Sequence, residues 1–97
     1  MFEDLAGQVA VVTGGARGLG LEMADALAET GCSVVLLDIG DRVEPAAARL
    51  GERRGVPTIG LQVDVTDDAA LATVFRRVVD ELGTPAVLVN AAGVAAW

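Results

Sequence analysis

The sequence predicts an α/β fold in which four parallel strands alternate with three helices. Short continuous runs of apolar residues, rich in valine, are typical of strands that are buried on both faces. Four such runs alternate with segments of helical period. Each connection is long enough for the crossover that parallel pairing requires, and the helices then cover the sheet. We therefore expect a Rossmann-type, doubly wound parallel sheet of partial extent, in the order β-α-β-α-β-α-β.

The four predicted strands lie at residues 8–13, 33–38, 58–63 and 86–90. The first, second and fourth (QVAVVT, SVVLLD and AVLVN) are strongly apolar, whereas Gly60 and Gln62 interrupt the third (TIGLQV). In open α/β sheets a ligand binds beyond the carboxyl ends of the strands. We therefore expect the binding site where these strands end, at Thr13–Gly14, Asp38, Asp64 and Asn90.

Segments of helical period separate the strands. In the first, Leu19, Met23 and Leu27 recur at every fourth residue, and Gly31 follows as a stop signal. The second segment has a weaker pattern. The residues that mark its first turn, its apolar face and its end are Pro45, Ala46, Ala47, Leu50, Gly55 and Pro57.

The third segment has the clearest helical spacing. Its apolar residues follow the i, i+3, i+4, i+7 pattern at Leu71, Val74, Phe75, Val78, Val79 and Leu82. Either Thr66 or Asp67 can cap the start of this helix, and Gly83 with Pro85 closes it.

Composition and charge exclude several classes of protein. A length of 97 residues allows one domain at most, and a hydrophobic content of 53% is too high for a disordered tail. The formal net charge of -7, from 14 acidic and 7 basic residues, argues against nucleic acid or an anionic membrane as the main partner. It does not exclude a phosphate ligand, because backbone N–H groups bind phosphate without a cationic side chain.

The single cysteine and the absence of targeting signals bear on the compartment. Cys32 stands alone, so the chain has no internal disulfide, and we expect a small buried residue at a strand start. The acidic start MFEDLAGQ is unlike a signal peptide. The most apolar stretch, PAVLVNAAGVAAW, is shorter than the roughly 20 residues of a membrane helix. We expect a soluble cytoplasmic protein that has no metal site.

The segment TGGARGLG joins the first strand to the first helix, with Gly14, Gly18 and Gly20 spaced G-x-x-x-G-x-G. No G-K-[ST] follows, so hydrolysis of ATP or GTP is not expected. Gly14 allows a tight turn, Gly18 lets a ligand approach the backbone, and Gly20 lets the helix pack closely on the sheet. The N-terminus of the helix then offers unpaired N–H groups to a pyrophosphate. The alternative is a glycine-rich surface turn.

Three motifs follow one another along the chain: TGGARGLG, the pair Asp64–Val65, and NAAG from Asn90 to Gly93. The first resembles the T-G-x-x-x-G-x-G signature of the short-chain dehydrogenase/reductase family. The pair stands where that family has its adenine-contacting residues, and NAAG resembles its second signature, after the fourth strand. The resemblance covers essentially the whole chain. It implies a nicotinamide dinucleotide cofactor and, in the intact enzyme, hydride transfer to or from an alcohol or carbonyl substrate.

The resemblance also implies roles for individual residues. The backbone from Ala16 to Gly20 would lie near the pyrophosphate and the adenosine ribose. Asp38 would accept hydrogen bonds from the ribose hydroxyls, and Asp64 would bind the adenine amino group. Two alternatives stay open, since Asn90 can tie the central strands together and Asp64 can be a capping or turn acid. The implied cofactor-binding residues are Gly14, Ala16, Arg17, Gly18, Leu19, Gly20, Asp38, Ile39, Asp64, Val65, Asn90, Ala91, Ala92 and Gly93.

The residues that carry out the family's reaction are not found in this sequence. That reaction needs a Ser, a Tyr and a Lys from the later half of the fold, but this chain has no tyrosine, and all seven basic residues are arginine. We expect no catalytic residue here. Residues 1–97 are expected to be the N-terminal part of one dinucleotide-binding domain, truncated before its catalytic half and inactive alone. The alternative is a stand-alone, non-catalytic nucleotide-binding or interaction module; a methyltransferase fits less well, because NAAG has no role there.

Asp38 bears on the choice of cofactor. It ends the second strand, 18 positions after Gly20, close to the spacing of about 20 for a ribose-binding acid. A carboxylate there can accept from both ribose hydroxyls of NAD but would face the 2′-phosphate of NADP. Arg17 argues the other way, because relatives that use NADP often carry a basic residue at this place, and Arg42 is near in sequence. We expect NAD rather than NADP, a substrate that the sequence does not identify, and a homo-oligomeric intact enzyme.

Overall fold

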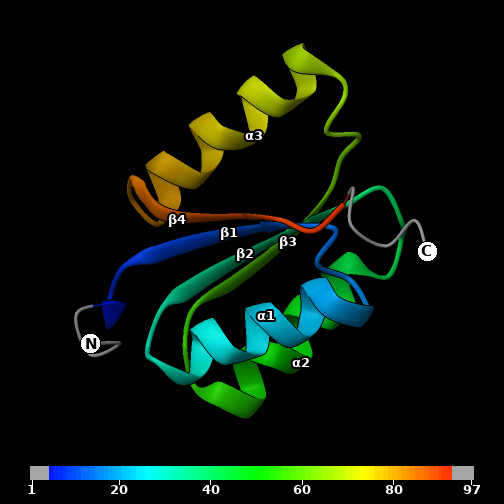
Figure 1. Ribbon diagram of the computed structural model, residues 1–97. Helices are drawn as coiled ribbons and strands as arrows, with labels where there is room; N and C mark the ends of the chain where they lie inside the picture. Colours follow the sequence, from blue (N-terminus) through cyan, green and yellow to red (C-terminus); the bar gives the residue numbers. More distant parts are fainter. Residues whose placement is uncertain (1–4, 93–97) are drawn as a thin grey trace.

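The computed structural model describes residues 5–92, which form a parallel sheet between two layers of helices (Figure 1). The predicted order of elements is confirmed. The elements are β1 (Val9–Thr13), α1 (Gly18–Glu29), β2 (Ser33–Asp38), α2 (Val43–Arg54), β3 (Thr58–Gln62), α3 (Asp68–Glu81) and β4 (Pro85–Asn90).

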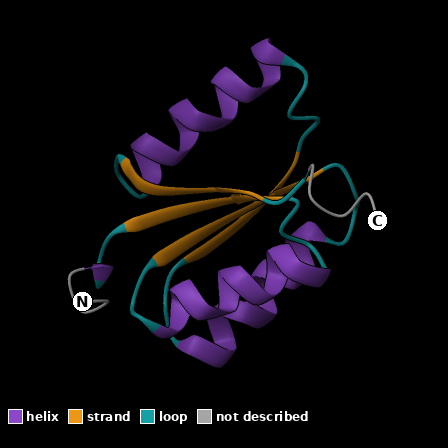
Figure 2. Cartoon of the chain, viewed as in Figure 1, coloured by secondary structure: helices purple, strands orange, loops and turns teal. Residues whose placement is uncertain are grey.

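The strands lie in the order β3-β2-β1-β4, and all three neighbouring pairs are parallel. Within β1, Val12 is paired with Leu36 of β2 on one side and with Val89 of β4 on the other. Helices α1 and α2 cover one face of the sheet and α3 covers the other (Figure 2). Because all four strands are parallel, their carboxyl ends lie at one edge of the sheet.

The core is divided by the sheet into two clusters, because successive side chains of a strand point to opposite faces. The cluster toward α1 and α2 consists of Ala10, Val12, Ala24, Ala28, Cys32, Val34, Leu36, Val43, Ala46, Ala47 and Leu50. The buried residues toward α3 are Val9, Val11, Val35, Leu37, Val63 and Val78. All of β1 is buried, as expected for a strand in the middle of a sheet that is covered on both faces.

Helix α1 packs on the sheet through small residues. The repeat that predicted this helix does not mark its buried face, since Leu19 is 52% exposed and Met23 38% exposed. The buried residues are Gly20, Ala24 and Ala28. A Cβ at Gly20 would collide with the carbonyl oxygen of Gly14, so the helix lies too close to the preceding loop for a larger residue. The close approach therefore decides which face of α1 turns inward.

The other two helices begin and end close to the positions predicted. Helix α2 buries its predicted apolar face and ends at Gly55, which has a φ of 68°. For α3 the structure selects Asp67 over Thr66 as the cap, because the Asp67 side chain accepts a hydrogen bond from the Ala70 N–H at 3.1 Å. Val79, predicted on the apolar face of α3, is 45% exposed. Among the described residues, none of the helices has both the length and the apolar character needed to cross a membrane.

Candidate functional site

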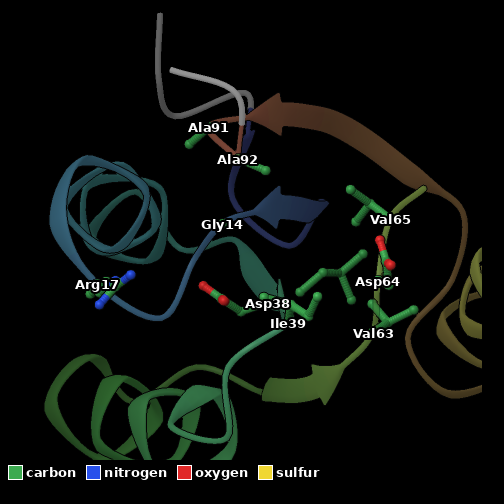
Figure 3. A pocket seen from close by; sticks show the side chains of 10 residues that line it. Gly14, Arg17, Asp38, Ile39, Val63, Asp64, Val65, Ala91 and Ala92 are labelled. Atoms are coloured by element: carbon green, nitrogen blue, oxygen red, sulfur yellow. The ribbon is translucent and has the colours of Figure 1, made fainter. Parts of the chain in front are cut away.

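A cavity of about 280 Å³ lies at the carboxyl ends of the strands (Figure 3). It is lined by Gly14, Arg17, Leu37, Asp38, Ile39, Val63, Asp64, Val65, Ala91 and Ala92. All of these except Leu37 and Val63 are predicted site residues. The sheet therefore brings together segments that lie far apart in the sequence, at the edge where a ligand was expected.

The glycine-rich loop, defined here as residues 14–17, forms the wall of this cavity between β1 and α1. Gly14 has a φ of 67° and Gly18, the first residue of α1, has a φ of 58°. Residues other than glycine rarely adopt this left-handed backbone conformation. A Cβ at Gly14 would lie 2.8 Å from the Ala92 Cα, whereas a Cβ at Gly18 would meet no atom within 4 Å. Gly14 is therefore needed for packing, and Gly18 leaves the backbone open on the side where a ligand would approach.

Three N–H groups of this region bond to the end of β2. The Leu37 carbonyl accepts from the N–H of Gly14 at 2.7 Å and from that of Gly15 at 3.2 Å. The Ala16 N–H donates to Asp38 Oδ2 at 3.0 Å. Ala16, whose backbone was expected near the pyrophosphate and the adenosine ribose, therefore already has a protein acceptor for its N–H.

The N-terminus of α1 differs from that of α3 in having no side-chain cap. Arg17 precedes α1 in an extended conformation without a capping hydrogen bond, and the first turn holds no acidic residue. By contrast, Asp67 caps α3. The first-turn N–H groups, those of Gly18 to Gly20, lie beyond the helix's own ladder of hydrogen bonds and carry the positive end of its dipole. This end of α1 suits an anionic group.

Asp38 reaches from the end of β2 toward the glycine-rich loop, on the side of Arg17 (Figure 3). Its Oδ2 accepts from Ala16, and its Oδ1 accepts from the Gly40 N–H at 3.0 Å. The next residue, Ile39, is 68% exposed, so its apolar surface is available to a flat ring.

Asp64 forms a turn with Thr66, which is one of the two roles considered for it. Its Oδ1 accepts from the Thr66 N–H at 2.9 Å and from the Thr66 hydroxyl at 2.6 Å. These two hydrogen bonds hold the pKa of the Asp64 carboxyl below its usual range, because they favour the charged form. The turn role does not use Oδ2, for which no hydrogen bond occurs within residues 5–92.

Asn90 ties β4, which lies at the edge of the described sheet, to its neighbour β1. The Thr13 hydroxyl donates to Asn90 Oδ1 at 2.8 Å, and the Ala91 N–H donates to the Thr13 carbonyl at 3.1 Å. Five described residues of the predicted site do not line this first cavity: Ala16, Gly18, Leu19, Gly20 and Asn90. Gly93 lies outside the described residues.

A second cavity, of about 290 Å³, adjoins the first at Asp38. Its lining residues are Ala16, Arg17, Asp38, Ile39, Gly40, Asp41, Arg42 and Arg49. Arginines thus outnumber carboxylates here, although the whole chain has twice as many acidic as basic residues. Sequence reasoning missed Arg49, but a signal was present: it follows Arg42 by seven positions, two turns of helix, on the same face.

Together the two cavities and the neighbouring start of α1 offer three kinds of contact. The start of α1 offers N–H donors to an anion, Asp38 offers a carboxylate to hydroxyl groups, and the apolar side chains of Ile39, Val63 and Val65 offer a surface to a flat ring. The described part of the chain holds no cluster of three or more His, Cys, Asp or Glu residues arranged for a metal ion. This donor set fits an adenine dinucleotide.

Comparison with known proteins gives a consistent result. The sequence model described as "short chain dehydrogenase" matches residues 8–97. The chain is 39% identical over 95 residues to cis-4-hydroxycyclohexanecarboxylate dehydrogenase of Sinomonas cyclohexanicum, covering 98% of this chain and 38% of the relative. It is 39% identical over 92 residues to the NAD-dependent glycerol dehydrogenase of Listeria innocua, covering 95% of this chain and 35% of that protein. The chain thus spans little more than a third of the length of these curated relatives.

Solved structures show the same likeness. The crystal structure of L-sorbose reductase from Gluconobacter frateurii, complexed with NADPH and L-sorbose, superimposes with a TM-score of 0.84 and 34% sequence identity. The match covers 91% of this chain and 34% of that one. The NAD-dependent relative and the NADPH complex thus represent the two nicotinamide cofactors.

Proposed function

The chain belongs to the short-chain dehydrogenase family, and from that premise we propose that it is the NAD(H)-binding segment of an oxidoreductase. In the intact enzyme, hydride would pass between the nicotinamide and an alcohol or carbonyl substrate. When bound, the dinucleotide supplies the group that accepts or donates the hydride. Residues 1–97 then form the N-terminal part of one dinucleotide-binding domain, and this part binds and orients the cofactor.

One observation carries the proposal: Arg17, which directly precedes the uncapped N-terminus of α1, and the Asp38 carboxylate line the same pair of adjoining cavities. The first-turn N–H groups of α1 would bind the pyrophosphate, because helix dipoles favour anions at this end. Asp38 would accept hydrogen bonds from the ribose hydroxyls, since each carboxylate oxygen has lone pairs left after its bond to one N–H.

The adenine ring would occupy the part of the cavity near β3. Ile39 and Val65 present apolar surface there, and Asp64 keeps Oδ2 for the exocyclic amino group. The Val65 N–H would donate to a ring nitrogen. On the opposite wall, Ala91 and Ala92 are small enough to let the cofactor pass close to the end of β4.

The hydrogen bonds of Asp38 favour NAD over NADP. Both of its oxygens bond to backbone N–H groups, so the carboxylate cannot turn away from a 2′-phosphate without breaking them. At about 4 Å two like unit charges repel by about 1 kcal/mol in water and about 4 kcal/mol at an effective dielectric near 20. Arg17, Arg42 and Arg49 oppose this preference, but their side chains are exposed and can move into solvent.

The proposed function excludes catalysis by this chain alone. The resemblance to the family implies a reaction that needs a Ser, a Tyr and a Lys from the later half of the fold. This sequence has neither tyrosine nor lysine. Arg17 and Asp38 cannot replace them, since both border the adenosine end of the proposed site. The substrate and the oligomeric state of the intact enzyme would depend on residues outside this chain, and we propose a homo-oligomer for it.

Equilibrium titration of the chain with NAD and with NADP tests the proposal. We expect NAD to bind at least about tenfold more tightly, equivalent to about 1.4 kcal/mol. Asp38→Ser should shrink or reverse this ratio, because it removes the charge and leaves Arg17 free to meet the phosphate. Asp80→Asn, which removes an equal charge from an exposed position on α3, should leave the ratio unchanged. Equal or tighter binding of NADP by the unmutated chain would contradict the role of Asp38, and failure to bind either cofactor would contradict the proposed function.

A further inference from the structure

The glycine-rich loop is held against β2 by main-chain and side-chain acceptors. The two bonds to the Leu37 carbonyl come from the backbone, so they are available whatever residue occupies position 37. The third bond is different, because the Ala16 N–H donates to a side-chain oxygen of Asp38, 22 residues away in sequence. Only a side chain at position 38 that is long enough and ends in a hydrogen-bond acceptor can bond to the Ala16 N–H.

The other oxygen of the same carboxylate holds the turn that follows β2. Asp38 Oδ1 accepts from the Gly40 N–H, so one side chain connects the β1–α1 loop to the β2–α2 turn. Gln62 supports this turn from the other side, since its Nε2 donates to the Ile39 carbonyl at 2.9 Å. The carboxylate is thus part of the framework of the site as well as of its surface.

We propose that Asp38 is a positioning residue for the glycine-rich loop, in addition to its contact with ribose. By tying Ala16 to Gly40, it sets the path of the chain into Arg17 and the first turn of α1 before any ligand arrives. The proposal rests on the proposed function for the identity of the ligand, but the loop contacts themselves are independent of it.

Charge makes this connection stronger than an ordinary turn contact. Hydrogen bonds from N–H groups to a carboxylate are about twice as strong as those between neutral groups. Without them, a larger fraction of molecules would have the loop away from its binding conformation. The apparent affinity for a ligand falls in proportion to the fraction of molecules in the competent conformation. Asp38 would therefore influence the binding of a pyrophosphate that it does not touch.

Because Asp38 holds the loop, a substitution intended to change the cofactor preference should also weaken binding in general. A serine at position 38 has one oxygen on a shorter side chain and cannot hold Ala16 and Gly40 together. Asp38→Ser is therefore expected to change the ratio of the two affinities while weakening the binding of both dinucleotides through the loop. A contact with ribose alone would weaken only the binding of NAD.

The test separates the ribose contact from the loop contact by removing the ribose hydroxyls from the ligand. ADP and 2′,3′-dideoxy-ADP are titrated against the unmutated chain, Asp38→Asn and Asp38→Ala, with Asp80→Asn as the charge control. The Asn and Ala variants lose the same charge, but Asn keeps one acceptor oxygen. We expect Asp38→Ala to bind 2′,3′-dideoxy-ADP about fivefold more weakly than Asp38→Asn does, the effect of one hydrogen bond. Equal affinity of the two variants for this ligand would overturn the positioning role.

Amide hydrogen exchange without ligand gives a second readout. The Gly14 N–H donates to the Leu37 carbonyl and not to Asp38, so its exchange reports the loop as a whole. We expect exchange at Ala16 and Gly14 to be about fivefold faster in Asp38→Ala, with partial rescue in Asp38→Asn. Unchanged exchange at both amides would overturn the proposal. If the unmutated chain binds neither nucleotide, the proposed function is refuted, and the exchange data alone decide whether Asp38 positions the loop.

Discussion

Replacement of Gly20 by alanine should destabilise the fold, although alanine is the better helix former. A Cβ at this position would lie 2.8 Å from the Gly14 carbonyl carbon, closer still to its oxygen, and 3.3 Å from the Ala91 Cβ. Gly14 has little room to move away, because the backbone of Ala91 and Ala92 lies so close that a Cβ built on Gly14 would be 2.8 Å from the Ala92 Cα. The strain can be relieved only by moving α1 away from the sheet.

The expected size of the effect follows from two opposing terms. Overpacking in a tight interior costs about 1–3 kcal/mol, and contact with the backbone favours the upper part of this range. The higher helix propensity of alanine than of glycine offsets at most about 1 kcal/mol of this cost, and less near a helix end. We expect a net destabilisation of about 1–2 kcal/mol, which in a domain of this size lowers the melting temperature by about 4–16 °C.

Thermal and urea unfolding, followed by circular dichroism at a fixed protein concentration, measure this effect. Glu22→Ala is the matched control, because this residue lies on the same helix and is exposed. Its free energy of unfolding should change by less than about 0.5 kcal/mol. A Gly20→Ala variant as stable as the unmutated chain would refute the close packing of α1 on the glycine-rich loop.

Three further predictions concern pH, association and activity. Two hydrogen bonds from Arg54 hold the pKa of Asp25 below its ordinary value of 3.8, so their contribution to stability is complete at neutral pH and is lost as the pH falls through the lowered pKa. The difference in melting temperature between the unmutated chain and Asp25→Asn should therefore narrow between about pH 6 and about pH 3, and a difference independent of pH would contradict this. Leu88, on the edge strand β4, is 62% exposed, so the chain should self-associate as its concentration rises. Sedimentation experiments should show less association for Leu88→Lys. A monomer at every concentration of the unmutated chain would contradict this prediction. The 97-residue chain, without tyrosine or lysine, should not oxidise NADH with any carbonyl substrate, and enzyme-dependent loss of NADH absorbance would refute that expectation.

The strands and their parallel pairing were predictable, because a strand that is buried on both faces appears in the sequence as a continuous apolar run. Four valine-rich runs with helical segments between them allow few other topologies. The cap of α3 was left open between Thr66 and Asp67, because both residue types can accept the same bond. Only the position of the Ala70 N–H decides between them.

The inward face of α1 and the side-chain contacts of the site were less accessible to sequence reasoning. Leu19 and Met23 have the stronger apolar signal, but the small residues Gly20 and Ala24 pack inward because the loop passes so close. The two bonds of Asp38 to backbone N–H groups depend on the register of β1 against β2 and on the path of two turns. Residue type alone does not specify such contacts, so only the ribose contact was expected for this carboxylate.

The central claim is that the carboxyl end of the sheet binds a nicotinamide dinucleotide. Amide chemical-shift changes on adding NAD to the isotopically labelled chain test it most directly. The largest changes should lie at the start of α1 and beside the two carboxylates, at Gly18, Leu19, Gly40 and Val65, while the amides of α3 stay unaffected. The absence of any change at saturating NAD, or changes centred on α3, would contradict the claim.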